Sequence, residues 1–261
     1  MKNILITNDD GYEAAGLKAL VEAINELDDV KVTVVAPATE KSACGHSLTL
    51  TRPLRLINVD DDFYKVDDGT PTDCVFISLN NLFKEGYKPD LVISGINIGA
   101  NLGEDITYSG TASAAMEAVL QGIPAIAISQ VYKWGDTDMI NWDYALAKKT
   151  IKEIVLKIFE DGFPLPERKF LNVNIPAIKV DECKGIKFTN AGYREYGNDT
   201  HRHSNPRGEE YYWIGLHPLI WQPSPTLDSD FDVIKDNYVS ITPIKLDMTS
   251  YEDIKTLEGW L

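Results

Sequence analysis

Short apolar runs alternate from residue 4 to residue 174 with segments in which apolar residues recur every three or four positions. The runs are typical of buried strands and the other segments of amphipathic helices. Strands are predicted at 4–7, 32–36, 91–94, 124–129 and 170–174, and helices at 17–27, 112–120 and 143–161. Strands that alternate with helices in this way predict an α/β fold with a doubly wound, mostly parallel sheet.

Two less regular segments lie between these elements. Residues 48–59 alternate loosely and are expected to pair antiparallel with residues 63–66. Residues 69–73, Gly-Thr-Pro-Thr-Asp, are typical of a helix entry, and the apolar side of that helix runs on to Phe83.

The pattern changes past Pro176. Residues 186–245 are rich in Tyr, Trp, Pro and turn residues, and strands are expected at 186–189, 211–214 and 238–242 but no helix. The chain is therefore divided into a catalytic core (1–185), a β-rich arm (186–245) and a tail (246–261) that ends in a short helix. The aromatic content of the arm is typical of a subunit interface, but a small β subdomain folded onto its own chain fits it equally.

The first strand ends in Asn8-Asp9-Asp10-Gly11. Neighbouring side chains of a strand point to opposite faces, so Asp9 and Asp10 reach one target only if the backbone has left extended geometry, which Gly11 permits. Two adjacent carboxylates at the carboxyl end of a parallel strand favour a hard divalent cation. The alternative, weighted equally, is a solvated turn that caps the following helix.

A glycine-rich loop follows the strand at 91–94. Glycines 95, 99 and 103 allow a close approach of backbone to ligand, but neither the dinucleotide fingerprint nor the P-loop is present, and a purely structural loop remains an alternative. Ser109, Gly110 and Thr111 open the helix that comes next, where free N–H groups and hydroxyls attract a phosphate. The plainer reading is that Ser109 or Thr111 is only the N-cap, a role that does not exclude phosphate binding.

A polar loop at 39–47 supplies Lys41, Ser42, His46 and Ser47. His46 is a candidate acid or base, although a histidine in such a loop more often satisfies a local hydrogen bond. The sequence has no Ser-His-Asp order, no His-Glu-x-x-His and no zinc-type Cys/His spacing, which disfavours serine-nucleophile and zinc-peptidase chemistry.

The composition limits the binding partners and the cellular location that can be expected. The formal net charge of −15 disfavours binding of duplex nucleic acid. The three widely spaced cysteines are typical of reduced thiols, the N-terminal apolar run is too short for a signal peptide, and no run has the length of a membrane span. We therefore expect a soluble cytoplasmic protein with no membrane association.

Five motifs stand in order at suitable spacing. They are Asn8 to Gly11; Val35-Ala36-Pro37 with Lys41-Ser42 and His46 to Thr49; Gly69 to Val75; Ser94 to Gly103; and Tyr108 to Thr111. Each motif alone is weak, but together they closely resemble the SurE family of survival proteins, metal-dependent nucleoside monophosphate phosphatases. The resemblance covers nearly the whole chain, because residues 172–176 and 238–243 also fit the later segments of the family.

The resemblance implies a Rossmann-like core and one divalent ion, Mg²⁺ or Mn²⁺, per subunit, held by Asp9, Asp10, Ser42 and Asn97. Asp9 and Asp10 are then also the catalytic candidates. The residues expected to bind the phosphate of the substrate are Asn8, Asn97, Ser109, Gly110 and Thr111. The family further implies an arm exchanged between subunits of a homodimer or homotetramer.

The expected activity is hydrolysis of nucleoside 5′- and 3′-monophosphates, with short polyphosphate as an additional candidate substrate. One alternative is a non-catalytic nucleotide-binding stress module. A second is an aspartyl-phosphate phosphatase, which needs two aspartates two residues apart, whereas Asp9 and Asp10 are adjacent. Two departures from the family pattern are Lys41 in place of Arg and Asn237 in place of Gly.

Overall fold

The computed structural model describes residues 1–83, 87–132, 143–195, 197, 199–215, 220–222 and 228–261. Its centre is a nine-stranded sheet. The strands of this sheet are β1 (Lys2–Thr7), β2 (Val30–Pro37), β3 (Arg55–Asp60), β4 (Phe63–Asp67), β5 (Leu91–Ile98), β6 (Ala125–Gln130), β7 (Lys169–Ile175), β8 (Ile186–Phe188) and β13 (Val239–Lys245). They lie in the order β3-β4-β2-β1-β5-β6-β7-β13-β8. The predicted α/β, doubly wound sheet is thereby confirmed.

The strands from β4 to β7 are all parallel, and antiparallel pairs join β3 to β4 and β13 to β7. Strand β1 is buried on both faces, as central parallel strands are. Ile4 and Ile6 lie in the hydrophobic cluster on one side of the sheet, and Leu5 lies in the cluster on the other. This alternation makes β1 the shared centre of both halves of the core.

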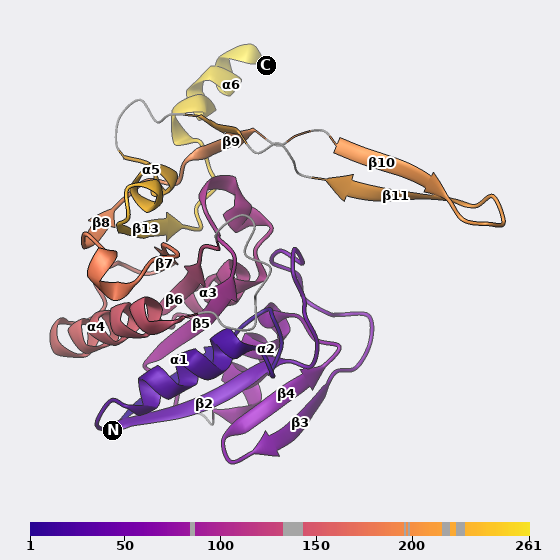
Figure 1. Cartoon of the computed structure of the whole chain (residues 1–261). Coiled ribbons are helices and arrows are strands. Elements are labelled where there is room, and N and C mark those ends of the chain that lie inside the picture. Colours follow the sequence, from indigo (N-terminus) through magenta and orange to yellow (C-terminus); the bar gives the residue numbers. More distant parts are fainter. Residues whose placement is uncertain (84–86, 133–142, 196, 198, 216–219, 223–227) are drawn as a thin grey trace.

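Helices cover both faces of the sheet (Figure 1). The helices α1 (Ala15–Asn25) and α4 (Ala145–Asp161) pack on one face, and α2 (Pro71–Ile77), continued by a π-helical turn at Ser78–Leu82, packs with α3 (Gly110–Leu120) on the other. α3 consists mainly of small residues and is buried along nearly its whole length. Its backbone therefore lies close to the sheet.

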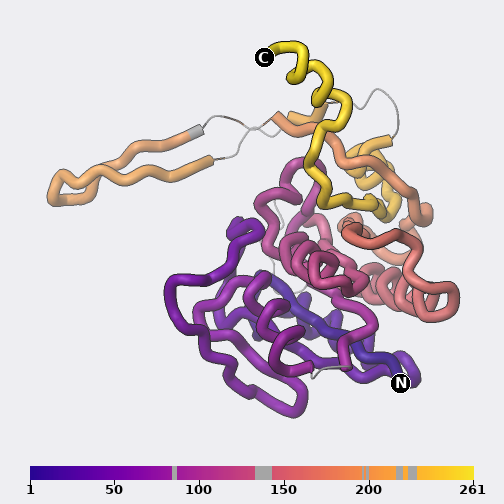
Figure 2. The backbone as a smooth tube through the Cα atoms, turned by 180° about the vertical axis from the view of Figure 1, so that it is seen from behind, coloured from indigo at the N-terminus to yellow at the C-terminus, as the bar shows by residue number. Residues whose placement is uncertain are grey.

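The C-terminal third of the chain both leaves and rejoins the sheet. Between β8 and β13 lie the short strands β9 (Tyr193–Glu195) and β12 (Ile220–Gln222), which pair with each other, and the hairpin of β10 (Asp199–Ser204) and β11 (Glu210–Gly215). The hairpin extends away from the body of the molecule in both views (Figures 1 and 2). β8 and β13 were both expected in the arm, and the structure places them in the main sheet.

Several expected elements differ from the structure in detail. Only 55–60 of the expected strand 48–59 pairs with β4. A short helix, α5 (Asp230–Lys235), lies where no helix was expected, because Ser229 and Asp232 form a capping box that starts it. Asn237, found in place of the family glycine, has a φ of 66°, a conformation that Asn tolerates better than most residues.

The chain ends in α6 (Ile254–Trp260), the expected terminal helix, whose residues are all exposed. Among the described residues, none of the helices has the length and apolar character that crossing a membrane requires. Cys44, Cys74 and Cys183 are free thiols.

Candidate functional site

The candidate site lies where the winding of the sheet reverses. From β1 the chain adds β2 and β4 on one side, while β5, β6 and β7 follow on the other. Loops at the carboxyl ends of the strands diverge at such a point and leave room for a ligand. The carboxyl ends of β1 and β5 carry the residues Asn8 to Asp10 and Asn97, which the sequence singled out.

The chain turns sharply after β1. The strand ends at Thr7, and Asp9 and Asp10 lie in a bend, so their side chains are freed from strand alternation. Gly11 has a φ of 100°, and a Cβ there would lie 3.3 Å from the backbone of Thr39. The glycine thus allows the chain to turn and the 39–47 loop to pass close by.

A β-bulge in β5 turns Asn97 and Ile98 toward this bend. The register with β6 shifts between Ser94 and Asn97, so Gly95 and Ile96 lie opposite a single residue of β6. A Cβ on Gly95 would lie 2.2 Å from the carbonyl oxygen of Ile128, which explains the glycine. Bulges redirect side chains at the ends of strands. Asn97 was expected in a loop, and the structure places it within β5 itself.

A backbone hydrogen bond joins the two strand ends. The amide of Ile98 donates to the Asp10 carboxylate over 3.2 Å. The side chain of the neighbouring Asn97 donates to the carbonyl of Gly99 over 2.9 Å, so its amide oxygen is the atom left for a ligand.

The first turn of α3 faces Asp9. The Thr111 hydroxyl donates a short hydrogen bond to the Asp9 carboxylate, and a Cβ on Gly110 would lie only 2.7 Å from the Cβ of Asp9. Ser109 is the N-cap, since its hydroxyl accepts from the amide of Ala112 over 3.0 Å. The sequence analysis assigned this turn to a phosphate, and the structure shows that a carboxylate of the protein itself already lies against it.

Both carboxylates are hard to ionise where they lie. Burial raises the pKa of Asp9, although hydrogen bonds from Thr111 and the nearby backbone oppose the rise. Burial, and then the charge of Asp9, raises the pKa of Asp10 to about 7. Burial and the charge of Asp10 also raise the pKa of the neighbouring Tyr144 phenol to about 12. Ionisation of both carboxylates therefore requires a compensating cation.

Asn8 supports the bend and offers a further polar atom. Its side chain is fully buried and donates to the carbonyl of Gly11 over 2.9 Å. Its Oδ1 is buried without a hydrogen-bond partner among the described residues. A buried acceptor without a partner costs about 1–3 kcal/mol, so a donor or cation at this atom would be stabilising.

The loop that carries Ser42 lies beside the bend, although the Ser42 side chain itself is exposed. The amide of Lys41 donates to the Asp9 carbonyl over 2.7 Å, which fixes this part of the 39–47 loop at the bend. The Ser42 hydroxyl donates to Glu40 over 2.7 Å, and the charge of Glu40 contributes to the raised pKa of Asp10. Glu40 is a third carboxylate near the site that the sequence analysis did not identify.

The donor set suits a hard cation. Within the described part of the chain, no group of three or more His, Cys, Asp or Glu side chains is arranged to hold a metal ion. A metal here would therefore take two carboxylates, and its other ligands from neutral oxygens such as those of Asn97 and Ser42. An all-oxygen set around two carboxylates fits Mg²⁺ or Mn²⁺, and the unbalanced charge of Asp9 and Asp10 supplies the attraction.

His46 lies away from the carboxylates. Its Nε2 is 3.1 Å from Oε2 of Glu117, a nearly buried residue of α3. The sequence analysis did not single out Glu117, because its place in a helix of small residues gives no sign of a partner in a distant loop.

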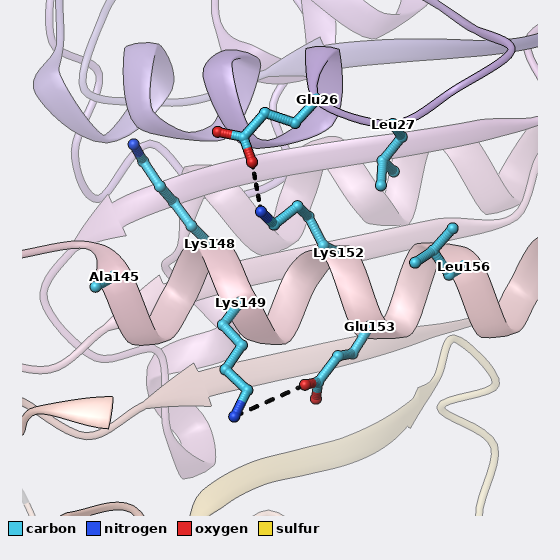
Figure 3. Close-up of a pocket in the computed structure, with 8 residues that line it drawn as sticks. All are labelled: Glu26, Leu27, Ala145, Lys148, Lys149, Lys152, Glu153 and Leu156. Carbon is cyan, nitrogen blue, oxygen red and sulfur yellow. Dashed lines mark hydrogen bonds and ion pairs between the residues drawn. The ribbon is translucent and has the colours of Figure 1, made fainter. Parts of the chain in front are cut away.

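A second concavity lies on the opposite face, between α1 and α4 (Figure 3). It has a volume of about 530 Å³ and is lined largely by charged side chains. Lys152 pairs with Glu26 over 2.5 Å, and Lys149 pairs with Glu153 over 3.9 Å. The Lys152–Glu26 pair joins α4 to the end of α1, whereas Lys149 and Glu153 both belong to α4. Exposed ion pairs of this kind are typical of a solvated surface between two helices.

Comparison with known proteins gives consistent matches along the chain. The family model described as "Survival protein SurE" matches residues 4–198. The 5′-nucleotidase SurE of Aliarcobacter butzleri (strain RM4018) is 69% identical over 100% of this chain and 99% of its own, and that of Sulfurovum sp. (strain NBC37-1) is 63% identical over 100% and 98%. The crystal structure of the SurE protein from Aquifex aeolicus, 42% identical, superposes with a TM-score of 0.82 and covers 99% of both chains.

Proposed function

This chain belongs to the SurE family, and we propose that it is a metal-dependent 5′-nucleotidase that releases phosphate from nucleoside monophosphates. Relatives named 5′-nucleotidase SurE match the whole chain at up to 69% identity. The observation that carries the proposal is the pair of adjacent carboxylates at the switch point of the sheet, Asp9 buried and Asp10 partly buried, both with raised pKa values. Such a pair calls for a cation, and a cation there would attract a phosphate.

We propose that Asp9, Asp10, Ser42 and Asn97 hold one Mg²⁺ or Mn²⁺ ion. When bound, such an ion polarises a phosphoryl oxygen and lowers the pKa of a water molecule. Ion binding also offsets the repulsion between the two carboxylates, which explains how the protein tolerates both in one buried bend.

The protein residues then orient the reaction. Thr111 donates to Asp9 and so holds that carboxylate in one position. Either Asp9 or Asp10 would orient the attacking water or accept its proton. The Ser109 hydroxyl and Asn8 would offset charge that develops on the phosphoryl oxygens, while Gly110 and Thr111 at the start of α3 hold Asp9.

The proposal also covers the range of substrates, the cellular location and the oligomeric state. They are activity on nucleoside 3′-monophosphates and short polyphosphate, a cytoplasmic location, and a homodimer or homotetramer formed through the arm. The exposed aromatic residues of β11, Tyr211, Tyr212 and Trp213, support the assembly, because such residues are favoured at interfaces.

The test is phosphate release from nucleoside 5′- and 3′-monophosphates with added Mn²⁺, Mg²⁺ or chelator. We expect release with the metals and none with chelator. Asp9→Asn should lose metal binding and turnover together while the circular dichroism spectrum is unchanged, and Asp28→Asn, an exposed aspartate after α1, should behave like the wild type. Nucleotide binding without any phosphate release would instead identify a non-catalytic binding module.

A further inference from the structure

The loop that carries Ser42 lacks regular secondary structure along its described length. It runs from residue 38 to residue 54, between β2 and β3, and many of its side chains are exposed. Such a segment needs specific contacts to keep one conformation. Asp68, after β4, pairs with Lys41 and Arg52, and further contacts come from helices α2 and α3 on one face of the sheet.

The far half of the loop is held by Asp73 of α2. This carboxylate is 2% exposed and accepts from both the amide and the hydroxyl of Thr49, over 2.9 and 2.7 Å. The Thr70 hydroxyl, at the N-cap of α2, donates to the carbonyl of Ser47 over 2.8 Å. Residues 47–49 are thus fixed to the start of α2.

The middle of the loop is held by Glu117 of α3. This carboxylate is 5% exposed, and it lies 3.1 Å from His46 Nε2 and 2.7 Å from the side-chain amide of Gln121, which donates to it. Burial raises the pKa of Glu117, but the hydrogen bonds from His46 and Gln121 outweigh burial and lower the pKa overall. The group that His46 contacts is therefore an ionised carboxylate, a strong acceptor for its Nε2 hydrogen.

The same part of the loop is joined to the candidate site. The amide of Gly45, next to His46, donates to the carbonyl of Tyr108 over 3.0 Å, just before the N-cap of α3. On the other side of Ser42, the amide of Lys41 donates to the carbonyl of Asp9 over 2.7 Å. A displacement of His46 would therefore be passed to residues 41–45, which include Ser42.

The geometry points to His46, held by Glu117, as a positioning residue that fixes residues 41–45 and so places Ser42 for metal binding. Glu117 lies seven residues after Gly110, which corresponds to about 10 Å along the helix axis. Gly110 is the residue that faces Asp9. Glu117, the residue that His46 Nε2 contacts, therefore lies about two helical turns from the residue that faces Asp9. This inference rests on the proposed function, since it concerns the metal of the same site.

Two amide substitutions distinguish the positioning role from acid catalysis. In His46→Gln the side-chain nitrogen takes the place of Nε2 and still reaches Glu117, whereas in His46→Asn it takes the place of Nδ1 and does not. Neither amide can act as an acid. Asp28→Asn, at an exposed position after α1, is the control.

We expect His46→Asn to weaken Mn²⁺ binding, measured by titration calorimetry, by about tenfold or more, as loss of a supporting contact around a metal site does. Activity should fall by the same factor on AMP and on p-nitrophenyl phosphate, whose leaving group needs no acid. His46→Gln should keep most of the Mn²⁺ affinity and most of the activity of the wild type. If both variants keep wild-type Mn²⁺ affinity and lose activity on AMP alone, His46 is an acid and the inference fails.

A measurement without metal separates this inference from the proposed function. Amide hydrogen exchange at Lys41 and Gly45 should be faster in His46→Asn than in the wild type and in His46→Gln. Equal exchange in all three proteins would contradict the positioning role, whatever the activity. Absence of Mn²⁺ binding and of phosphate release in the wild type would contradict the proposed function, while the exchange rates would still decide whether His46 holds the loop.

Discussion

The Thr111 hydroxyl donates a hydrogen bond to the Asp9 carboxylate, and this contact joins the start of α3 to the end of β1 across 102 residues of sequence. Both side chains are buried, at 0% and 4% exposure. The contact holds the Asp9 carboxylate against the start of α3, where its Oδ1 accepts from Thr111 and its Oδ2 lies beside Gly110. It also opposes the rise of the Asp9 pKa that burial causes.

Removing that hydroxyl should destabilise the protein. Thr111→Val keeps the shape of the side chain but leaves a buried carboxylate without its donor, at a cost of about 1.5–3 kcal/mol in the free energy of unfolding. Thr111→Ser keeps the donor and should lose less. Urea denaturation of the metal-free proteins measures both, and equal stability of the Val and Ser variants would show that the hydrogen bond contributes nothing.

Gly110 should not tolerate a side chain. The Cβ of an alanine there would lie 2.7 Å from Asp9 Cβ and 2.9 Å from Asp9 Oδ2, so either the helix or the carboxylate must shift. We expect Gly110→Ala to lose about 1–3 kcal/mol of stability from overpacking and to bind Mn²⁺ at least tenfold more weakly. Gly259→Ala is the control, because no atom lies within 4 Å of the added Cβ. Wild-type Mn²⁺ affinity in Gly110→Ala would show that α3 does not confine Asp9.

The stability of the metal-free protein should fall as the pH rises from about 4 to about 7. The pKa of Asp10 is raised from 3.8 to about 7, so in this range the folded state binds more protons than the unfolded state, and unfolding becomes easier as protons are lost. The expected decrease is on the order of a few kcal/mol. Urea denaturation in chelator at a series of pH values measures it.

Two controls accompany the pH series. Asp10→Asn removes one of the two carboxylates with raised pKa values and should make the fall in stability between pH 4 and 7 shallower. Saturating Mn²⁺ should stabilise the protein most at the upper end of the range, because the metal competes with protons for the same carboxylates. A stability that rises with pH in the metal-free wild type would contradict the raised pKa of Asp10.

The root of the arm should loosen when Asp230 is replaced. This fully buried carboxylate accepts from the amides of Gly103 over 2.8 Å and of Gly192 over 3.0 Å, and so links the loop before α3 to the segment before β9. Asp230→Ala leaves both buried donors unpaired and should cost about 2 kcal/mol or more. Amide hydrogen exchange should accelerate at Gly103 and Gly192 together, and acceleration at one alone would show that Asp230 does not couple the two segments.

Much of the core could be predicted from the sequence because its signals are local. Apolar runs and helical periodicity located β1, β2, β5, β6, β7, α1, α3 and α4 to within a few residues. The two adjacent carboxylates, and the glycine after them, indicated the bend and its place at a strand end. Each of these features depends on neighbouring residues alone.

The features that the sequence did not reveal depend on contacts between distant segments. Asn97 was predicted to lie in a loop because Gly95, two residues before it, is typical of a loop. In the structure the strand continues past this glycine through a bulge. In the sequence, Glu117 and Asp230 look like ordinary helix residues. Their partners lie far away along the chain: His46 contacts Glu117, and the amides of Gly103 and Gly192 donate to Asp230. The assignment of β13 to the sheet likewise depends on pairing with β7 and β8, on its two sides, and not on its own composition.

The pairing of β8 with β13 has a consequence for how the protein can diversify. Because these strands are parallel neighbours at one edge of the sheet, the chain between them leaves the carboxyl end of β8 and returns to the amino end of β13. Insertions or deletions in that excursion leave the spacing of its two anchors unchanged. Relatives can therefore remodel the projecting hairpin while the carboxylate bend, on the other side of three intervening strands, keeps its geometry.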